Sequence, residues 1–367
     1  MKRFSTIAIC LLLTYTIVCA QERVIDATDH SPVAAASIFD ATGNMVGVTL
    51  NDGCITEIPK TAYPITIRSI GYEQLVIEQQ EDKAWPMTPI AYELEEFVVV
   101  PVERNILKQT FYVREYFSMT TVDDTITIFF EHMANRFLPA SEDAKFSGSS
   151  SLRVLKSRCF SRYKVAEEDS FAIDSKPLFP SMVTIHRVNT KEVAAPESFK
   201  DPDNTNKLYE EPGKSGIALI QKQNAHTFIT IRDILAETKE HDISFWPLKI
   251  FGLTIKAKQL YNTHTYCIND NGIYQPKDLI EAGSVMEADG GGKLLRKLFK
   301  SEEPIIIRSM IEVYTTDREY LTKNEAKKEY KNKPDNVEFE IPTTVPPLTD
   351  AIKQLVERAT AKKVMTL

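Results

Sequence analysis

Cysteine is scarce in this chain of 367 residues, which has five in all, two of them within the first twenty residues. The other three, Cys54, Cys159 and Cys267, are too few for a disulfide framework. They leave open either one bridge with a free thiol or three buried thiols. No two cysteines form a Cys-x-x-Cys pair, so the sequence predicts neither a zinc ribbon nor a thioredoxin-type redox site.

Long apolar runs are equally rare, since only one exists and it lies at the extreme N-terminus. This excludes a membrane protein with several helical spans. Lysine and arginine number 44 against 51 aspartates and glutamates, a net charge of −7, which disfavours a general nucleic-acid binder. With 13 glycines and 19 prolines the composition is that of an ordinary globular protein, so collagen-like and low-complexity chains are excluded as well.

The single apolar run has the layout of a secretory signal peptide. Lys2 and Arg3 form a short positive region, the apolar run extends from Ile7 to Val18, and small residues follow as far as Ala20. Positive charge, a short apolar core and a small-residue cleavage site are the three parts of such a peptide. We predict cleavage after Ala20 and an exported chain that begins at Gln21.

Two alternatives to cleavage remain open. One is an uncleaved membrane anchor, and the other is lipidation of Cys19, which the bulky residues before it fit poorly. Loss of the signal peptide, residues 1–20, removes two cations and no acids, so the exported net charge becomes 42 − 51 = −9. The predicted location is the periplasm or the outer membrane, with no transmembrane span left after cleavage.

Residues 21–100 are predicted to form a β-sandwich, because short alternating runs are broken there by turn residues. Asn51-Asp52-Gly53 separates two such runs, and Asp-Gly is a strong signal for a tight hairpin. No helical period occurs among the runs, which are Ser37–Asp40, Met45–Leu50, Ile55–Ile58, Ile65–Ile70, Leu75–Ile77 and Phe97–Val100.

Several short motifs follow one another in this segment: Val24-Ile25-Asp26, Pro32-Val33, Ala36-Ser37-Ile38, Gly47-Val48-Thr49, Asp52-Gly53 and Ile70-Gly71-Tyr72. In this order they resemble the carboxypeptidase regulatory-like domain, a prealbumin-like sandwich found in exported proteins of Gram-negative bacterial envelopes. Cys54 departs from the family pattern, which has a polar residue there. The resemblance implies a seven-strand-type sandwich that has no catalytic activity of its own.

The chain length and the spacing of the histidines exclude two classes of larger protein that carry this module. A TonB-dependent receptor needs a barrel of about 22 strands of roughly 10 residues each, and only 367 − 100 = 267 residues follow position 100. A zinc carboxypeptidase needs a His-x-x-Glu ligand pair. No glutamate stands three residues after any of the six histidines, which are His30, His132, His186, His226, His241 and His264.

Residues 101–121 are predicted to be a connector and residues 122–367 a strand-dominated α+β domain, so that the whole chain is mainly β plus α+β. From Ile126 to Phe137, apolar residues recur at i, i+3, i+4, i+7, i+8 and i+11, which predicts an amphipathic helix that packs on a sheet. Asp123 or Asp124 would cap this helix, and His132 would lie at its rim.

Shorter patterns fill the rest of the domain. Thr322-Lys323-Asn324-Glu325 predicts a capping box, and Thr349 an N-cap for a helix with Ile352, Leu355, Val356 and Ala359 on its apolar face. Loops are predicted at Ala140–Ser151 and Ala194–Ser215, and a hairpin turn at Asn269–Gly272. The predicted strands are Leu152–Leu155, Phe160–Val165, Met182–Val188, Ile217–Gln221, Trp246–Ile255, Thr263–Ile268, Ile305–Thr315 and Val337–Ile341.

Motifs for phosphate binding and for nucleophilic catalysis are incomplete. Gly290-Gly291-Gly292-Lys293 is not a phosphate-binding loop, because Glu287 and Leu294 replace its first glycine and its hydroxyl. Gly213-Lys214-Ser215-Gly216 is not a nucleophile elbow. The helix predicted at Lys293–Lys300 carries four cations and four apolar residues, which favours a solvated helix over one resting on anionic lipid.

The nearest approach to a metal site is two ligand types at short spacing, which arises often by chance. The candidates are Glu240-His241-Asp242 and His264 with Cys267. The acid pairs Asp123-Asp124, Glu167-Glu168 and Glu302-Glu303 are interpreted as solvated surface charges or as charges at helix starts. We therefore predict no catalytic, cofactor-binding or metal-ligating residue.

The leading functional hypothesis is an exported, non-catalytic envelope protein. Its sandwich would be a docking module, and its second domain would bind a protein, a glycan or a lipid. One alternative is a hydrolase with an unrecognised site in the second domain, which a cleft with convergent histidines and acids would favour. Another is a periplasmic accessory of an outer-membrane transporter, because Glu93–Val99 resembles the strand that closes the sandwich in TonB-dependent receptors.

Overall fold

The computed structural model describes most of the chain between Glu22 and Met365. The described residues are 22–81, 83–90, 103–140, 144–146, 152–165, 168–173, 193–194, 207–210, 217–223, 228–237, 240–243, 252–267, 273–274, 276–300, 302, 304–332, 337–339, 341–343 and 345–365. The signal peptide prediction and the Phe97–Val100 strand lie outside them.

The N-terminal segment, residues 22–90, is built of short strands, as its alternating sequence predicts. Its strands are β1 (Arg23–Asp26), β2 (Ser37–Phe39), β3 (Met45–Val48), β4 (Ile65–Arg68), β5 (Leu75–Ile77) and β6 (Ala84–Met87). Four of them form an antiparallel sheet in the order β3-β2-β4-β5, and β1 pairs with β6 in parallel. One apolar core lies between the two sheets and includes Val24, Ile38 and Ile67. We call this unit the sandwich; its described residues hold a single 3-10 turn, η1 (Lys60–Ala62), and no α-helix.

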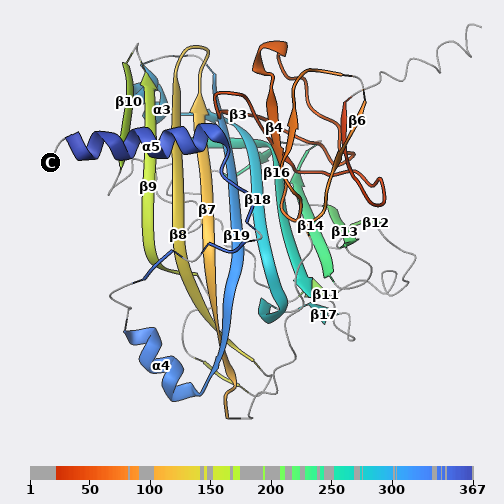
Figure 1. The fold of residues 1–367 in the computed structure, drawn as a ribbon, viewed down its shortest axis with the longest axis vertical. Helices are drawn as coiled ribbons and strands as arrows, with labels where there is room; N and C mark the ends of the chain where they lie inside the picture. Colours follow the sequence, from red (N-terminus) through yellow and green to blue (C-terminus); the bar gives the residue numbers. More distant parts are fainter. Residues whose placement is uncertain are drawn as a thin grey trace, which may run out of the picture.

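Most of the described residues after position 90 form one large antiparallel sheet, which runs in the order β10-β9-β8-β7-β19-β18-β16-β14-β13-β12, with β15 paired to β16 (Figure 1). Its central strands are long, and β19 extends over 17 residues. The strands are β7 (Ile106–Thr120), β8 (Thr125–Pro139), β9 (Arg153–Val165), β10 (Glu168–Ile173), β12 (Lys207–Glu210), β13 (Ile217–Gln223), β14 (Phe228–Ala236), β15 (His241–Asp242), β16 (Thr254–Cys267), β18 (Leu279–Gly291) and β19 (Ile305–Leu321). The expected strand-dominated fold class, mainly β with α+β features, is confirmed.

Among the residues that the structure describes, three α-helices accompany the sheet: α3 (Lys293–Phe299), α4 (Lys323–Lys331) and α5 (Asp350–Met365). The predicted capping box of α4 is confirmed, because Glu325 N donates to Thr322 Oγ1 at 3.3 Å and Thr322 N donates to Glu325 Oε2 at 2.8 Å. Thr349 Oγ1 accepts from Ile352 N at 3.4 Å and so caps α5. No helix within the described part of the chain is long and apolar enough to span a membrane.

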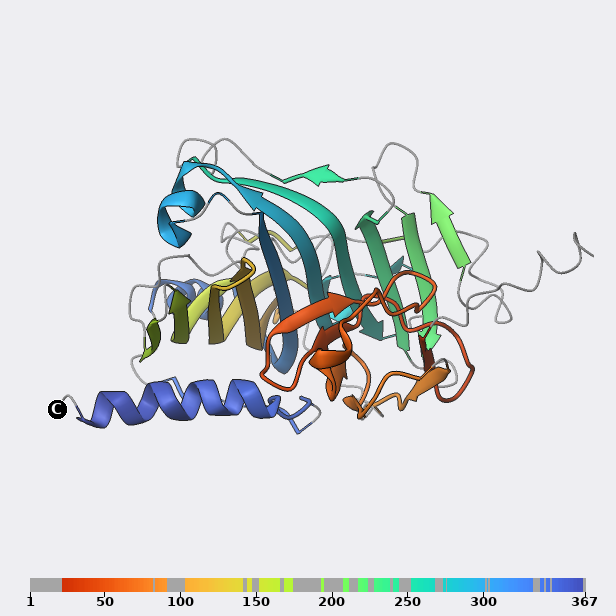
Figure 2. The ribbon, with the colours of Figure 1, turned by 90° about the horizontal axis from the view of Figure 1, so that it is seen from above.

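The two faces of the large sheet are covered by different elements (Figure 2). We call the side that carries the sandwich and α5 the sandwich face, where Tyr116, Phe129 and Met310 pack against both. On the opposite face, Phe117 and Phe130 pack in a cluster with Leu295 of α3. The same long strands therefore bury side chains on both sides.

The helix predicted from Ile126 to Phe137 is wrong, because this segment is the strand β8. Every residue from Ile126 to Leu138 is buried. Phe129 contacts the sandwich-face cluster while Phe130 contacts the cluster on the opposite face. A strand buried on both faces loses its alternation, and its apolar positions here matched a helical stripe by coincidence. Asp123 and Asp124 lie in the turn between β7 and β8 and not at a helix cap.

The connector predicted at residues 101–121 is wrong as well, since β7 occupies most of it and lies between β8 and β19. The Ala194–Ser215 loop contains β12, and residues 337–339 form no strand. A two-stranded pair, β11 (Val193–Ala194) with β17 (Ile273–Tyr274), was not predicted. Met182–Val188 and Asn269–Gly272 lie outside the described residues.

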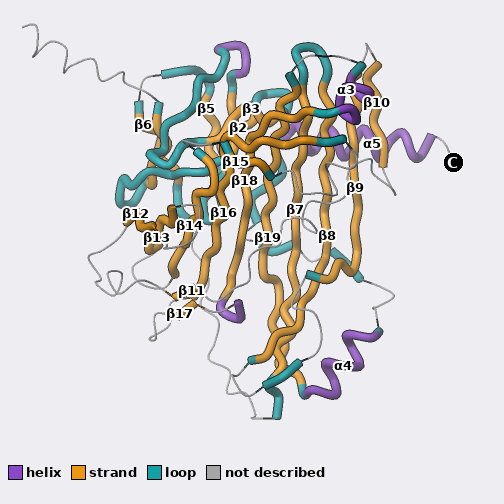
Figure 3. Tube along the Cα trace, turned by 180° about the vertical axis from the view of Figure 1, so that it is seen from behind, coloured by secondary structure: helices purple, strands orange, loops and turns teal. Residues whose placement is uncertain are grey.

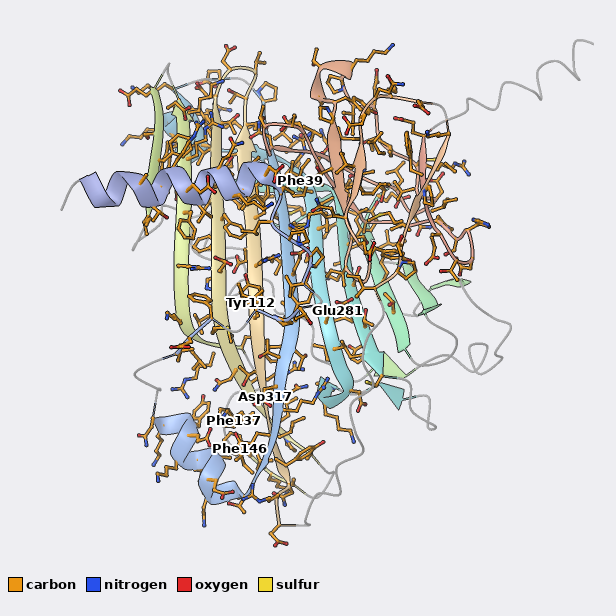
Figure 4. The ribbon with its side chains drawn as sticks, viewed as in Figure 1. Phe39, Tyr112, Phe137, Phe146, Glu281 and Asp317 are labelled. Atoms are coloured by element: carbon orange, nitrogen blue, oxygen red, sulfur yellow. The ribbon has the colours of Figure 1, made fainter. Side chains whose placement is uncertain are left out.

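The sandwich is fastened closely to the sheet and to α5. Tyr116 Oη on β7 accepts from Met45 N at 3.1 Å and donates to Gly43 O at 3.1 Å. Its ring meets that of Phe39 edge-on at 5.1 Å between centroids, close to the start of α5 (Figure 4). Gly43 has φ +80°, and a Cβ there would stand 1.9 Å from Ala351 Cβ. Only glycine lets this turn approach α5 so closely.

Candidate functional site

A row of charged side chains crosses the middle of the sandwich face. Glu312, Arg114, Glu131 and Arg158 stand directly opposite one another on β19, β7, β8 and β9. Residues directly opposed in an antiparallel pair share a face and have neighbouring Cβ atoms. The signs of the charges alternate along the row, so each ion has an opposite charge beside it.

Glu131 lies at the centre of the row and accepts hydrogen bonds on both of its oxygens. Tyr112 Oη donates to Glu131 Oε1, and Arg158 Nε donates to Glu131 Oε2 at 2.6 Å. Arg114 Nε in turn donates to Tyr112 Oη at 3.0 Å, while Arg114 Nη1 donates to Pro346 O at 2.6 Å. Burial raises the pKa of Tyr112, so the phenol remains a donor at neutral pH. Figure 4 shows Tyr112 at mid-height of the sheet.

Glu312 forms a salt bridge with Arg68, a side chain of the sandwich. Arg68 Nη2, at the end of β4, donates to Glu312 Oε1 at 3.1 Å and to Oε2 at 3.0 Å. The side chains of Arg68 and Glu312 are 1% and 2% exposed. A buried charge that loses its partner is costly, so this pair fixes how the sandwich sits on the sheet.

The opposite face carries a second set of polar pairs. His132 Nε2 lies 2.9 Å from Glu115 Oε1, and both side chains are 2% exposed. The prediction that His132 is a rim residue is therefore wrong, because β8 directs it into the interior beside the ring of Phe130. The pair has the composition of an acid–base dyad, yet neither side chain is open to a substrate in solvent.

The opposite face also buries an arginine, Arg136, and a histidine, His264. Arg136 Nε donates to Gln109 Oε1 at 2.7 Å, and Arg136 Nη2 donates to Pro276 O at 2.7 Å in the 3-10 turn η4 (Pro276–Asp278). Burial lowers the pKa of Arg136 to about 10. Burial, together with the charge of Arg136, lowers the pKa of His264 to about 4, so this histidine is neutral at physiological pH.

The metal-ligand candidates from the sequence do not converge. Glu240 is exposed, His241 and Asp242 form the short strand β15, and His264 is buried next to the ring of Tyr266. Cys267 is partly buried, and burial raises the pKa of its thiol. Across the described ranges, no group of three or more histidines, cysteines or acids could hold a metal ion.

The glycine run and the cationic helix have structural explanations. Gly292 has φ +103°, and a Cβ there would stand 1.9 Å from Gly252 O, so the run allows two backbone segments to approach. Helix α3 buries Leu295 and Phe299, while its cations are exposed. The preferred interpretation of a solvated helix agrees with this placement. Gly213–Gly216, Glu167 and Glu303 lie outside the described residues, and Glu302 is exposed and paired with Arg296.

A shallow hollow lies at the surface where α5, the sandwich and the sheet edge meet. Arg162 Cζ and Arg358 Cζ lie 5.4 and 5.3 Å from the ring centroid of Phe171 on β10. Arg162 also binds Asp169 at 2.8 Å and lowers the pKa of that carboxyl. The hollow is lined by Thr42, Gly43, Asn44, Thr127, Arg162, Phe171, Ala351, Ile352, Gln354, Leu355 and Arg358. Because Arg162 is paired with Asp169, Arg358 is the guanidinium group of this hollow that suits an anionic ligand.

Neither the charged row nor the His132–Glu115 pair was predicted from the sequence. A usable signal was present, because Arg114-Glu115 and Glu131-His132 are charged or titratable pairs within strongly apolar runs. A charged residue inside an apolar run is normally paired when it is buried. Which residues pair depends on strand register, and neighbours such as Glu312 and Arg114 are far apart in sequence.

Comparisons with known proteins add little. No family model matches the chain, and no curated protein matches it in sequence. Among solved structures, the chain is similar to lipovitellin, studied for its lipid–protein interactions, with 8% identity, 59% of this chain covered and a TM-score of 0.31. The chain spans 26% of that protein, and a similarity this low supports no conclusion about fold or function.

Proposed function

We propose that this protein is an exported, non-catalytic component of a Gram-negative cell envelope that binds a protein, a glycan or a lipid. The observation that carries the proposal is the burial of the reactive side chains of the sheet. Glu115, Glu131 and Glu312 are each 2% exposed, and each contacts a cationic or histidine partner. A catalytic carboxylate has to reach its substrate, whereas these carboxylates join strands and fasten the sandwich.

The resemblance of residues 22–100 to the carboxypeptidase regulatory-like domain belongs to the same proposal. Its strand-built described part supports a scaffold role, because the sandwich covers the sheet through Phe39, Tyr116 and the Arg68–Glu312 pair. The hollow at Phe171 is the proposed contact surface for the partner. Its exposed cation Arg358 would bind an acidic group.

Cell fractionation with protease shaving, followed by capture on the purified chain, tests this proposal. The protein is expected in the envelope fraction with an N-terminus at Gln21, as mass spectrometry would show. Captured envelope material should be at least fivefold lower with Arg358→Ala than with the wild type. Lys353→Ala, on an exposed position of the same helix, is the matched control and should capture normally.

An intact cytoplasmic pool would contradict export, and equal capture by Arg358→Ala would contradict the contact surface. A hydrolytic activity of the purified chain that Glu115→Gln abolishes would contradict the non-catalytic part. These three results are independent, so each part of the proposal can fail alone.

A further inference from the structure

A small cavity lies at the joint between the sandwich and the large sheet. The sandwich contributes Ala35, Ser37, Arg68, Ser69 and Ile70, and the sheet contributes Thr263, Gly283, Val285, Met310, Ile311 and Glu312. Its interior volume is about 20 Å³. A buried water molecule requires roughly 10–15 Å³ of such interior volume, so the cavity fits a ligand of one or two atoms.

Two buried side chains present hydrogen-bond donors to this cavity. Ser37 and Arg68 stand directly opposite each other on β2 and β4 and thus share a face. They are 0% and 2% exposed. Arg68 Nη2 is bound to Glu312, but Arg68 Nε, Arg68 Nη1 and Ser37 Oγ have no hydrogen-bond partner among the described residues.

The charge around the cavity is positive on balance. Arg232 lies on β14 opposite Thr263, one of the lining residues, and is 3% exposed. Its Nε and Nη1 atoms also lack a hydrogen-bond partner in the described part of the chain. Arg68 and Arg232 together carry two positive charges, and Glu312 compensates one of them.

We propose that the cavity binds a single monatomic anion of the halide class, which accepts from Ser37 Oγ and from one of the two unpartnered donors of Arg68, Nε or Nη1. A water molecule would place its own two hydrogens among donors, whereas an anion only accepts. The small volume suits a monatomic ion better than phosphate, sulfate or a carboxylate. The anion would make the joint between sandwich and sheet depend on halide concentration, a property beyond the proposed function.

Crystals of the full chain grown with sodium bromide in place of chloride test the site directly. An anomalous bromine peak within hydrogen-bond distance of Arg68 Nε or Nη1 is the expected result. Density for water alone, or no peak, would overturn the proposal.

Thermal unfolding then separates a functional site from an adventitious ion. At constant ionic strength with gluconate as the balancing anion, the wild-type midpoint should rise by about 2 °C for each tenfold increase in chloride above saturation. Between the wild-type dissociation constant for chloride and a concentration tenfold above it, Ser37→Ala should lose at least half of this rise, because its weaker site is not yet saturated there. Ser118→Ala removes a buried hydroxyl that does not line the cavity and should keep the full rise. A bromide peak without a chloride effect, or equal slopes for both variants, would mean an adventitious ion only and would overturn the proposal.

Discussion

The sandwich and the large sheet are both made of strands, but the sequence pattern indicates the strands of the sandwich more clearly than the long central strands β7 and β8 of the sheet. The sandwich strands have three or four residues and are separated by turns such as Asp52-Gly53. The central strands of the sheet have 13 to 17 residues and are buried on both faces over much of their length. Alternation of apolar and polar residues with a period of two indicates a strand that has one face exposed to solvent. Where both faces are covered, the period disappears and a helical stripe can arise by chance.

The tube view from behind shows the consequence of this difference (Figure 3). The strands β7, β8 and β19 run nearly the full height of the molecule, whereas the sandwich strands are short and set apart at one side. Buried pairs such as Arg68–Glu312 link the two regions. Breaking individual links shows how far the regions depend on each other.

The largest effect is expected at the Arg68–Glu312 pair. Arg68→Met leaves the Glu312 carboxylate buried without its partner, and the free energy of unfolding should fall by about 3–5 kcal/mol. Denaturant unfolding measures this change. In Arg68→Met/Glu312→Leu both charges are gone, so the double variant should be less destabilised than the sum of the single ones. Additive effects would mean that the two side chains act independently.

Substitution of Ile128 distinguishes the strand from the helix that the sequence suggests for this segment. Ile128 lies off the helical stripe but is fully buried in β8. Ile128→Ala should lower the free energy of unfolding by about 3 kcal/mol, because it opens a cavity in the core. Val76→Ala, at a half-exposed residue of the sandwich, should change it by no more than about 0.5 kcal/mol. A negligible effect at Ile128 would be inconsistent with β8.

The stability of the fold should depend on pH through His264, which is buried on the opposite face. The unfolded chain binds a proton at His264 near pH 6.5, whereas the folded chain does so only near pH 4. Unfolding therefore takes up a proton between these values, and stability falls as the pH is lowered through this window. The loss between pH 8 and pH 5 should be about 2 kcal/mol. In His264→Gln this part of the pH dependence should disappear; an unchanged slope would refute its assignment to His264.

The smallest effect is expected at the exposed cap of α4, far from the joint. Thr322→Ala removes the side-chain oxygen that accepts from Glu325 N. Loss of an N-cap costs about 1 kcal/mol. Chemical denaturation should show this loss without a change in the chloride dependence of the joint. A larger loss, or a coupled change in the chloride response, would show that α4 contributes to the joint.

Local signals predicted local structure well. The sandwich strands, the capping box at Thr322 and the apolar face of α5 depend on neighbouring residues, and the structure agrees with all three. The prediction for the β8 segment was wrong because the burial of this strand is decided by the sandwich on one side and by α3 on the other. The charged row was not predicted for the same reason. Placing Glu312 opposite Arg114 requires the register of two strands that are distant in sequence.

Calorimetry of the chain from Gln21 to Leu367 tests the central claim, that the sandwich and the sheet form one unit held by a buried joint. The account predicts a single unfolding transition whose calorimetric and van't Hoff enthalpies agree. Two separated transitions, the first of them confined to residues 22–90 by hydrogen exchange, would contradict it.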